Sequence, residues 1–264
     1  MMLEQTCEKL IAMRLYGMAH AIRERLERVD HQSLSKEEFL GLLVDDEWLY
    51  RENRQLTARL KVARFKQREA AIENIDYRIP RGLHKAQLLE LAQNRWITAH
   101  QCVLITGPSG AGKSYLAQAL GHNACRSGFS VQYVRLPTLL AQFVQARAQG
   151  TYDRLLKRLS KLALLVIDDF GLASLNELER QDLLEAIEER SGAGATLVTS
   201  QLPIADWHEY LGGGRLAVHD VDRGRRRRAR PQPGEQCIGV GVRGQGVEPN
   251  HVGADRHVLT EHPK

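Results

Sequence analysis

Long hydrophobic runs are missing from this sequence of 264 residues. The longest uninterrupted apolar stretch is L-A-L-L-V-I, Leu162 to Ile167, whereas a membrane-spanning helix needs about 20 apolar residues. The N-terminal stretch M-M-L-E-Q-T-C-E-K-L carries acids where a secretory signal carries bases, and it has no apolar core. These features exclude the membrane-helix and secreted classes, so we expect a cytoplasmic protein with no membrane partner.

Cysteine is also scarce, and its pattern excludes two kinds of site. Cys7, Cys102, Cys125 and Cys237 stand far apart, with no C-x-x-C pair and no Cys/His cluster. Such isolated cysteines indicate reduced thiols and provide neither a zinc site nor a disulfide framework.

Leucine is nearly absent from the last fifth of the chain. Residues 212–264 contain two leucines but 10 of the 22 glycines and 4 of the 8 prolines. A segment of this composition has too little apolar surface to build a core. We therefore expect residues 212–264 to be an atypical, disordered tail that follows folded protein.

The first 80 residues have the pattern of a small all-α region. Apolar residues recur at helical spacing over residues 3–28, which predicts one amphipathic helix. Ser35 and Glu38 have the spacing of a capping box, which would begin a second helix running toward Phe65. The stretch Asp76–Gly82 interrupts the pattern and is typical of a linker.

Residues 81–211 have the alternating pattern of an α/β domain. Short apolar strands are predicted at residues 102–106, 130–136, 162–168 and 196–200, with helical stretches between them. Strands that alternate with helices of this length form βαβ units and a parallel sheet. The fold class we predict is therefore α/β, with a parallel sheet flanked by helices.

The stretch V-L-I-T-G-P-S-G-A-G-K-S, Val103 to Ser114, fits the phosphate-binding pattern G-x-x-x-x-G-K-[ST]. It follows a predicted strand and begins a helix, as the motif requires, which disfavours the alternative of a glycine-rich turn without a ligand. Loop amides and the helix N-terminus would bind phosphate, the lysine would reach the β- and γ-phosphates, and the serine hydroxyl would bind Mg²⁺. The predicted cofactor site comprises Gly107, Pro108, Ser109, Gly110, Ala111, Gly112, Lys113 and Ser114.

A pair of carboxylates ends another apolar strand about 55 residues downstream. Asp168 is predicted to hold Mg²⁺ together with Ser114, because this cation prefers oxygen ligands. Asp169 could act as the general base for an attacking water. Alternatively, the two aspartates merely end a strand and begin a turn. With the glycine-rich loop upstream, we favour the catalytic interpretation, in which Lys113, Asp168 and Asp169 support hydrolysis.

The strand T-L-V-T-S-Q ends on polar side chains. Thr199, Ser200 or Gln201 could hydrogen-bond a γ-phosphate or the attacking water. A polar strand end before Pro203 is the alternative.

These segments together resemble the IstB-like ATP-binding proteins of bacterial insertion sequences. The resemblance is carried by I-D-Y-R-I-P-R-G-L, I-T-G-P-S-G-A-G-K-S, L-V-I-D-D-F-G-L and T-S-Q-L-P, and it covers about residues 1–217. Such proteins are P-loop NTPases of the AAA+ type, similar to DnaC-type helicase loaders. The resemblance implies ATP and Mg²⁺ as cofactors, double-stranded DNA and a transposase as partners, a homo-oligomer, and a sensor region at Ser200 and Gln201.

The resemblance also implies that the N-terminal helices help to bind DNA or partner proteins. A basic stretch is the candidate for DNA, because cationic side chains neutralise phosphates. Its members are Arg51, Arg54, Arg59, Lys61, Arg64, Lys66 and Arg68. A solvated helix face is the alternative.

The chain departs from the family beyond T-S-Q-L-P-x-x-x-W-H, at about residue 217. The family continues into an amphipathic lid helix with an Asp-Arg pair, and Asp222-Arg223 only faintly resembles it. The stretch D-R-G-R-R-R-R-A-R-P-Q-P-G, Asp222 to Gly234, then contains six arginines. We interpret this tail as the product of a frameshift near residues 217–224, and a genuine basic DNA-binding arm is the alternative.

The function expected from these features is an ATP-binding, ATP-hydrolysing helper of DNA transposition, with turnover impaired by loss of the lid. Two alternatives are a DnaC-like replicative helicase loader and an ATP-binding DNA scaffold without turnover. A small-molecule kinase is the weakest alternative, because no acceptor site is visible.

Overall fold

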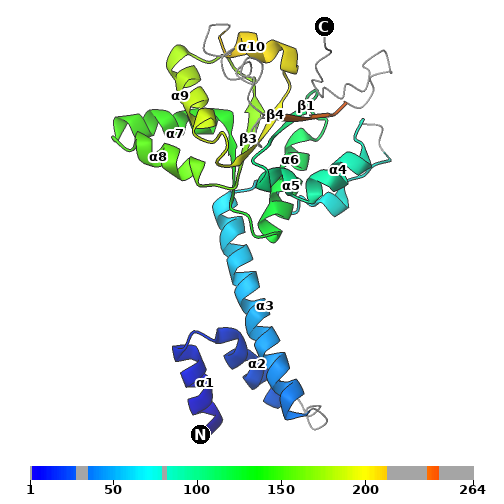
Figure 1. Ribbon diagram of the computed structural model, residues 1–264, viewed down its shortest axis with the longest axis vertical. Helices are drawn as coiled ribbons and strands as arrows, with labels where there is room; N and C mark the ends of the chain where they lie inside the picture. Colours follow the sequence, from blue (N-terminus) through cyan, green and yellow to red (C-terminus); the bar gives the residue numbers. More distant parts are fainter. Residues whose placement is uncertain (1, 28–34, 79–81, 213–236, 244–264) are drawn as a thin grey trace, which may run out of the picture. The chain divides into compact units, whose positions relative to one another are not determined.

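The computed structural model describes residues 2–27, 35–78, 82–212 and 237–243 (Figure 1). The chain divides into two compact units, Met1–Lys61 and Val62–Lys264. No helix in the described residues is long and apolar enough to cross a membrane.

The first unit contains α1 (Met2–Ala12), α2 (Tyr16–Glu27) and most of α3 (Lys36–Ala63). The prediction of one continuous helix over residues 3–28 is wrong, because the chain reverses between α1 and α2. Arg14 has a left-handed backbone, with φ of 62°, which ends α1 and begins the turn. The reversal lets apolar residues of both short helices share one small core with α3, made of Cys7, Ala21, Ile22 and Leu43.

The predicted capping box at the start of α3 is confirmed. The Ser35 N–H donates to Glu38 Oε2 at 2.8 Å, and the Glu38 N–H donates to Ser35 Oγ at 3.2 Å. The helix ends at Ala63, where Arg64 takes a left-handed backbone with φ of 57°. The second helix therefore stops two residues before Phe65.

Helices α2 and α3 approach closely at Gly17. A Cβ there would lie 2.7 Å from the Asp46 carbonyl oxygen, so only glycine fits. The gap is closed by the buried Glu47, whose Oε2 accepts the N–H groups of Gly17 at 2.7 Å and Met18 at 3.2 Å. These amides belong to the first turn of α2, where a negative charge also favours the helix dipole. A side chain of α3 thus caps α2.

Replacing Glu47 by alanine should destabilise α2 locally. The loss of two hydrogen bonds to a carboxylate is worth about 2 kcal/mol, which corresponds to amide exchange about 30-fold faster in α2. Hydrogen exchange of the peptide spanning Tyr16–Glu27 in the full chain would measure the change. Glu52→Ala, at an exposed position of the same helix, is the matched control, and equal exchange in both variants would contradict the capping role.

The second unit contains the sheet. Its strands are β1 (Cys102–Thr106), β2 (Val131–Arg135), β3 (Leu164–Phe170), β4 (Ala195–Ser200) and β5 (Cys237–Gly241). Its longer helices are α4 (Lys85–Ala92), α6 (Lys113–Arg126), α7 (Leu136–Ala148), α8 (Tyr152–Ser160) and α9 (Glu177–Glu188). Short helical turns lie at η2 (Ile72–Asn74), α5 (Arg95–Thr98), η3 (Ile204–Asp206) and α10 (Trp207–Tyr210).

All strand pairs of the sheet are parallel, in the order β2-β3-β4-β1-β5. Helices α7, α8 and α9 cover one face, and α4, α5 and α6 cover the other (Figure 1). The α/β fold class and the parallel sheet predicted from the sequence are therefore confirmed. Because parallel strands point the same way, β1, β3 and β4 bring their carboxyl ends to one edge.

A strand in the tail corrects one expectation. Cys237–Gly241 pairs with β1 in parallel register, from Cys102 opposite Cys237 to Thr106 opposite Gly241. The Val242 N–H extends the pairing by donating to the Thr106 carbonyl at 2.7 Å. The prediction of a disordered tail is thus wrong for residues 237–243. A short segment suffices there, because its backbone forms hydrogen bonds with the N–H and C=O groups at the outer edge of β1. The arginine run and Arg223 lie outside the described residues.

The second unit also begins earlier than the predicted boundary at residue 81. The segment after α3 packs on α6: Gln118 Oε1 accepts the N–H groups of Lys66 at 2.8 Å and Gln67 at 2.9 Å. The Phe65 ring stacks on His122, with centroids 4.2 Å apart. Residues from about 62 onward therefore pack with the sheet domain, although their basic composition does not suggest it.

Candidate functional site

The loop between β1 and α6 has the backbone that a phosphate-binding loop requires. Gly110 and Gly112 have left-handed φ angles of 74° and 91°, which residues with side chains seldom adopt. At Gly107, a Cβ would overlap the carbonyl of Val242. Glycine is thus required at all three positions, for curvature at two and for close approach at the third.

Lys113 lies at the N-terminus of α6 and is folded onto the loop. Its Nζ donates to the Pro108 carbonyl at 2.8 Å, and the side chain is largely buried. Burial lowers the pKa of Lys113, and the charges of Asp168 and Asp169 oppose this shift. The next residue along α6, Ser114, contacts Asp168 directly, so the loop that carries Lys113 lies against the end of β3 where the two aspartates stand.

Asp168 is the most enclosed acid of the site, with an exposed fraction of 2%. Its Oδ1 accepts the hydroxyl of Ser114 at 2.9 Å and also the hydroxyl of Thr199. Its Oδ2 accepts the hydroxyl of Tyr133 at 2.5 Å. The two predicted metal ligands, Ser114 and Asp168, are thus in direct contact although 54 residues separate them in the chain.

Asp169 sits on a bulge at the end of β3. Its φ is 61°, and the register with β4 shifts between Ile167 and Phe170, so Asp168 and Asp169 together lie opposite Thr199. In a regular strand, consecutive side chains point to opposite faces. A bulge re-aims a side chain, which is common near functional sites. Here it leaves both carboxylates at one edge of the sheet.

The Asp169 carboxylate is held by an arginine of the neighbouring strand. Arg135, the last residue of β2, forms an ion pair with Asp169 through its Nε. The hydrogen bond and the charge of Asp169 raise the pKa of Arg135. The Asp169 side chain remains 21% exposed, so solvent can reach the acid.

The strand end of β4 presents Thr199 to the carboxylates rather than Ser200. The Thr199 hydroxyl donates to Asp168 and accepts the N–H of Asp169 at 3.2 Å. The Ser200 hydroxyl instead donates to the Phe170 carbonyl at 2.8 Å and accepts the Leu202 N–H at 3.0 Å. Gln201 is exposed. Among the three candidates offered by the sequence, Thr199, Ser200 and Gln201, the geometry favours Thr199.

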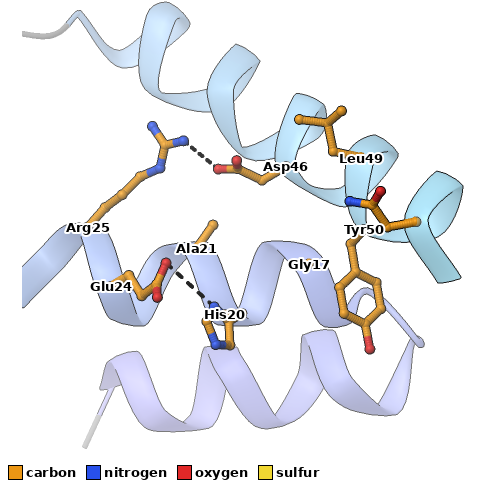
Figure 2. A pocket seen from close by; sticks show the side chains of 9 residues that line it. Gly17, His20, Ala21, Glu24, Arg25, Asp46, Leu49 and Tyr50 are labelled. Carbon is orange, nitrogen blue, oxygen red and sulfur yellow. Dashed lines mark hydrogen bonds and ion pairs between the residues drawn. The ribbon is translucent and has the colours of Figure 1, made fainter. Parts of the chain in front are cut away.

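One hollow in the described residues adjoins this site, and another lies in the first unit. A hollow of about 250 Å³ beside Asp169 is lined mostly by apolar residues of α7 and of the segment after β3. The other, of about 520 Å³, lies between α2 and α3 (Figure 2). Arg25 in its lining already pairs with Asp46 at 2.5 Å, and His20 Nδ1 lies 3.6 Å from Glu24 Oε2. The hollow between α2 and α3 thus offers no free cationic group for a phosphate.

The predicted DNA-binding residues do not form one continuous helical face. Arg51, Arg54, Arg59 and Lys61 lie on α3, whereas Arg64, Lys66 and Arg68 follow its end. Six of the seven are exposed, and Arg59 is half-buried. Arg51 pairs with Glu47 at 2.6 Å, and Arg54 lies over the Tyr16 ring at 5.9 Å. The cationic groups are therefore available at the surface, but in two separate segments.

Sequence reasoning missed Tyr133 and Arg135. They occupy alternate positions of β2 and so share a face, and each binds one of the two adjacent aspartates. The pattern Y-x-R at the end of the strand Val131–Arg135 was the available signal. Its meaning depends on β2 lying beside β3, which the sequence alone does not specify.

Comparison with known proteins gives a family. A model of the IstB-like ATP binding protein family matches residues 8–225. The insertion sequence ATP-binding protein y4pL of Sinorhizobium fredii is 46% identical over 223 residues, which cover 84% of this chain and 91% of that protein. An ATP-binding protein of insertion sequence IS1162 from Pseudomonas fluorescens is 43% identical over 203 residues, 77% of this chain and 88% of that protein.

Solved structures resemble this chain in fold over about two thirds of its length. AMPPCP-bound DnaA from Aquifex aeolicus has a TM-score of 0.51 at 19% identity, covering 67% of this chain and 51% of that chain. DnaI has a TM-score of 0.50 at 15% identity, covering 66% of this chain and 91% of that chain. The chain thus spans about half the length of the DnaA that it matches. At such identities the likeness concerns the fold alone.

Proposed function

Because this chain belongs to the family of IstB-like ATP-binding proteins, we propose that it binds ATP at Gly107–Ser114 and hydrolyses it in support of DNA transposition. The observation that carries the proposal is the contact between Ser114 and Asp168, 2.9 Å between Oγ and Oδ1. It joins the phosphate-binding loop to the acidic end of β3. A glycine-rich turn without a ligand would not need a buried carboxylate beside it.

The donor set fits a divalent cation shared with a nucleotide. Ser114 and Asp168 offer a hydroxyl and a carboxylate, the oxygen ligands that Mg²⁺ prefers. No cluster of three or more His, Cys, Asp and Glu that could hold a metal occurs in the described part of the chain. The cation would therefore take its remaining ligands from phosphate oxygens and water, as is usual for Mg²⁺ in ATPases. When bound, it would neutralise charge on the β- and γ-phosphates.

The protein's own groups would promote hydrolysis by positioning the nucleotide and the attacking water and by stabilising charge on the phosphates. Loop amides and the N-terminus of α6 would bind the phosphates, and the Lys113 ammonium would leave the Pro108 carbonyl to reach the β/γ region. Asp169 would accept a proton from the attacking water. Thr199 would hold both aspartates through its hydroxyl. By resemblance, an arginine of a neighbouring copy would complete the site.

The DNA and transposase partners are inferred from the relatives. The relatives from S. fredii and P. fluorescens are named as ATP-binding proteins of insertion sequences. The exposed basic residues of α3 and of the segment after it would bind the DNA backbone, because exposed cationic side chains favour phosphate. We propose a homo-oligomer on double-stranded DNA that acts with a transposase.

Lys113→Ala tests the ATP site. Removing a charged donor to phosphate should weaken ATP binding by about 10- to 100-fold, because such bonds are worth about 1.5–3 kcal/mol. Binding of a fluorescent ATP analogue to the full chain, measured by anisotropy with Mg²⁺ present, would report the change. Lys161→Ala, at an exposed position after α8, is the control. Equal affinity of both variants would contradict the assignment.

The partner is tested separately by co-purification with the transposase encoded beside the gene and with the host's replicative helicase. Retention of the transposase supports the proposal, and retention of the helicase alone would indicate a loader instead. ATP hydrolysis measured with and without DNA separates an ATPase from a scaffold that binds ATP without turnover.

The tail requires its own explanation. The family match ends at residue 225, which supports the proposal that a frameshift near residues 217–224 replaced a lid helix. Translation of the other frames of the gene should then give a leucine-bearing helix with an Asp-Arg pair. If neither frame does, the tail is a genuine basic arm, and deletion of residues 224–264 should reduce the salt dependence of DNA affinity.

A further inference from the structure

The carboxylate of Asp168 accepts three hydroxyl groups, and they are divided between its two oxygens. Ser114 and Thr199 donate to Oδ1, whereas Tyr133 donates to Oδ2 at 2.5 Å. Ser114 is also the proposed cation ligand. Oδ1 is therefore the oxygen that would be shared with a cation held by Ser114, and Tyr133 binds the other oxygen of the carboxylate.

Tyr133 is itself held firmly. It lies in the middle of β2 with an exposed fraction of 5%, opposite Val166 in the register of β2 with β3. Its ring contacts Phe65, with centroids 6.4 Å apart and planes tilted by 49°. Its hydroxyl is the donor in the contact with Asp168 Oδ2, because an ionised carboxylate can only accept hydrogen bonds.

The hydroxyl of Tyr133 has no evident packing purpose. Phenylalanine would fill the same space in this strand, and burying a hydroxyl is costly unless it is hydrogen-bonded. The hydrogen bond to Asp168 offsets that cost. A carboxylate held at Oδ1 alone could still rotate about its Cβ–Cγ bond, whereas bonds at both oxygens fix its plane.

We propose that Tyr133 is a positioning residue that orients Asp168 so that Oδ1 faces the divalent cation bound with ATP. The inference rests on the proposed ATP site and adds to it a residue of β2 outside the two nucleotide-binding motifs. Groups that orient a metal ligand in this way typically contribute 10- to 100-fold to metal affinity or activity. Tyr133 would thus lower the Mg²⁺ concentration that hydrolysis requires, and it would not change the affinity for the nucleotide itself.

Tyr133→Phe removes the hydroxyl and leaves the ring. We expect the Mg²⁺ concentration for half-maximal ATP hydrolysis to rise about tenfold or more. Binding of a fluorescent ATP analogue in EDTA should remain as in the unmodified protein, because Tyr133 is buried within β2 and lies outside the loop proposed to bind the phosphates. Thermal unfolding of both proteins, measured without nucleotide, would show whether the fold is intact.

Tyr115→Phe is the matched control. Tyr115 lies on α6 beside Ser114, but its hydroxyl exchanges hydrogen bonds of 3.3 Å with the backbone of Ala71. The same atom is removed there, and the Mg²⁺ requirement should not change. An unchanged requirement in Tyr133→Phe, or equal weakening with and without Mg²⁺, would overturn the positioning role.

The two proposals can fail separately. If Lys113→Ala weakens ATP binding while Tyr133→Phe behaves like the unmodified protein, the ATP site stands and the role of Tyr133 does not. If the unmodified protein binds no nucleotide in either condition, both proposals are wrong.

Discussion

Asp169→Asn should lower kcat for ATP hydrolysis by about a thousandfold, within the range that general bases contribute. The amide cannot accept a proton from water, whereas it keeps the size of the carboxylate and an oxygen that can accept from Arg135. The Thr199 hydroxyl would still accept the backbone N–H of residue 169. Affinity for the ATP analogue should change by no more than about threefold, because the substitution alters neither the loop nor Lys113.

Steady-state hydrolysis and nucleotide binding in the full chain, measured with saturating Mg²⁺, would separate these effects. Asp153→Asn, an exposed acid at the start of α8, is the control and should retain full activity. Hydrolysis at the unmodified rate in Asp169→Asn would exclude Asp169 as the base. A parallel loss of binding would instead indicate that the carboxylate helps to maintain the loop.

The second large effect is expected on stability, at the buried Arg190. Its exposed fraction is 1%, and its guanidinium donates to the carbonyls of Leu159, Leu162 and Ala195 and to the Thr196 hydroxyl. Burial lowers the pKa of Arg190 to about 10, so the group stays charged at neutral pH. One side chain thereby provides hydrogen-bond donors for backbone carbonyls at the end of α8 and at the start of β4.

Arg190→Met should lower the free energy of unfolding of the second unit by about 3–5 kcal/mol, because it leaves several buried acceptors without donors. Arg190→Lys should recover only part of this loss, since one ammonium cannot replace a planar guanidinium. Urea unfolding of the full chain, followed by circular dichroism, would measure both. Arg158→Met, at an exposed site of α8, is the control, and a similar small effect in all three variants would contradict the structural role.

Much of the fold and part of the site could be predicted from local sequence. The strand Cys102–Thr106 and the start of α6 at Lys113 agree with their predictions, because apolar runs bounded by glycine produce strong local signals. The residues of the glycine-rich loop are also contiguous in the chain, so the sequence alone predicts that the loop binds phosphate. These features depend on residues that are neighbours in the chain.

What escaped prediction depends on register and on tertiary contacts. The sequence named Thr199, Ser200 and Gln201 as alternatives, and the choice of Thr199 depends on the bulge, where two residues of β3 lie opposite one residue of β4. The contacts of Tyr133 and Arg135 depend on which strand is the neighbour of β3. Likewise, the reversal at Arg14 follows from burial against α3, and the helical periodicity of residues 3–28 continues across it.

The tail strand β5 has a consequence for how the protein would behave if it were shortened. A chain cut after residue 211 would lose β5 and leave the outer edge of β1 with unpaired N–H and C=O groups. It would also uncover Gly107, which Val242 contacts. An exposed edge of a parallel sheet is a template for adding strands from other molecules. Self-association of the truncated protein, rather than loss of its fold, is therefore the defect we expect.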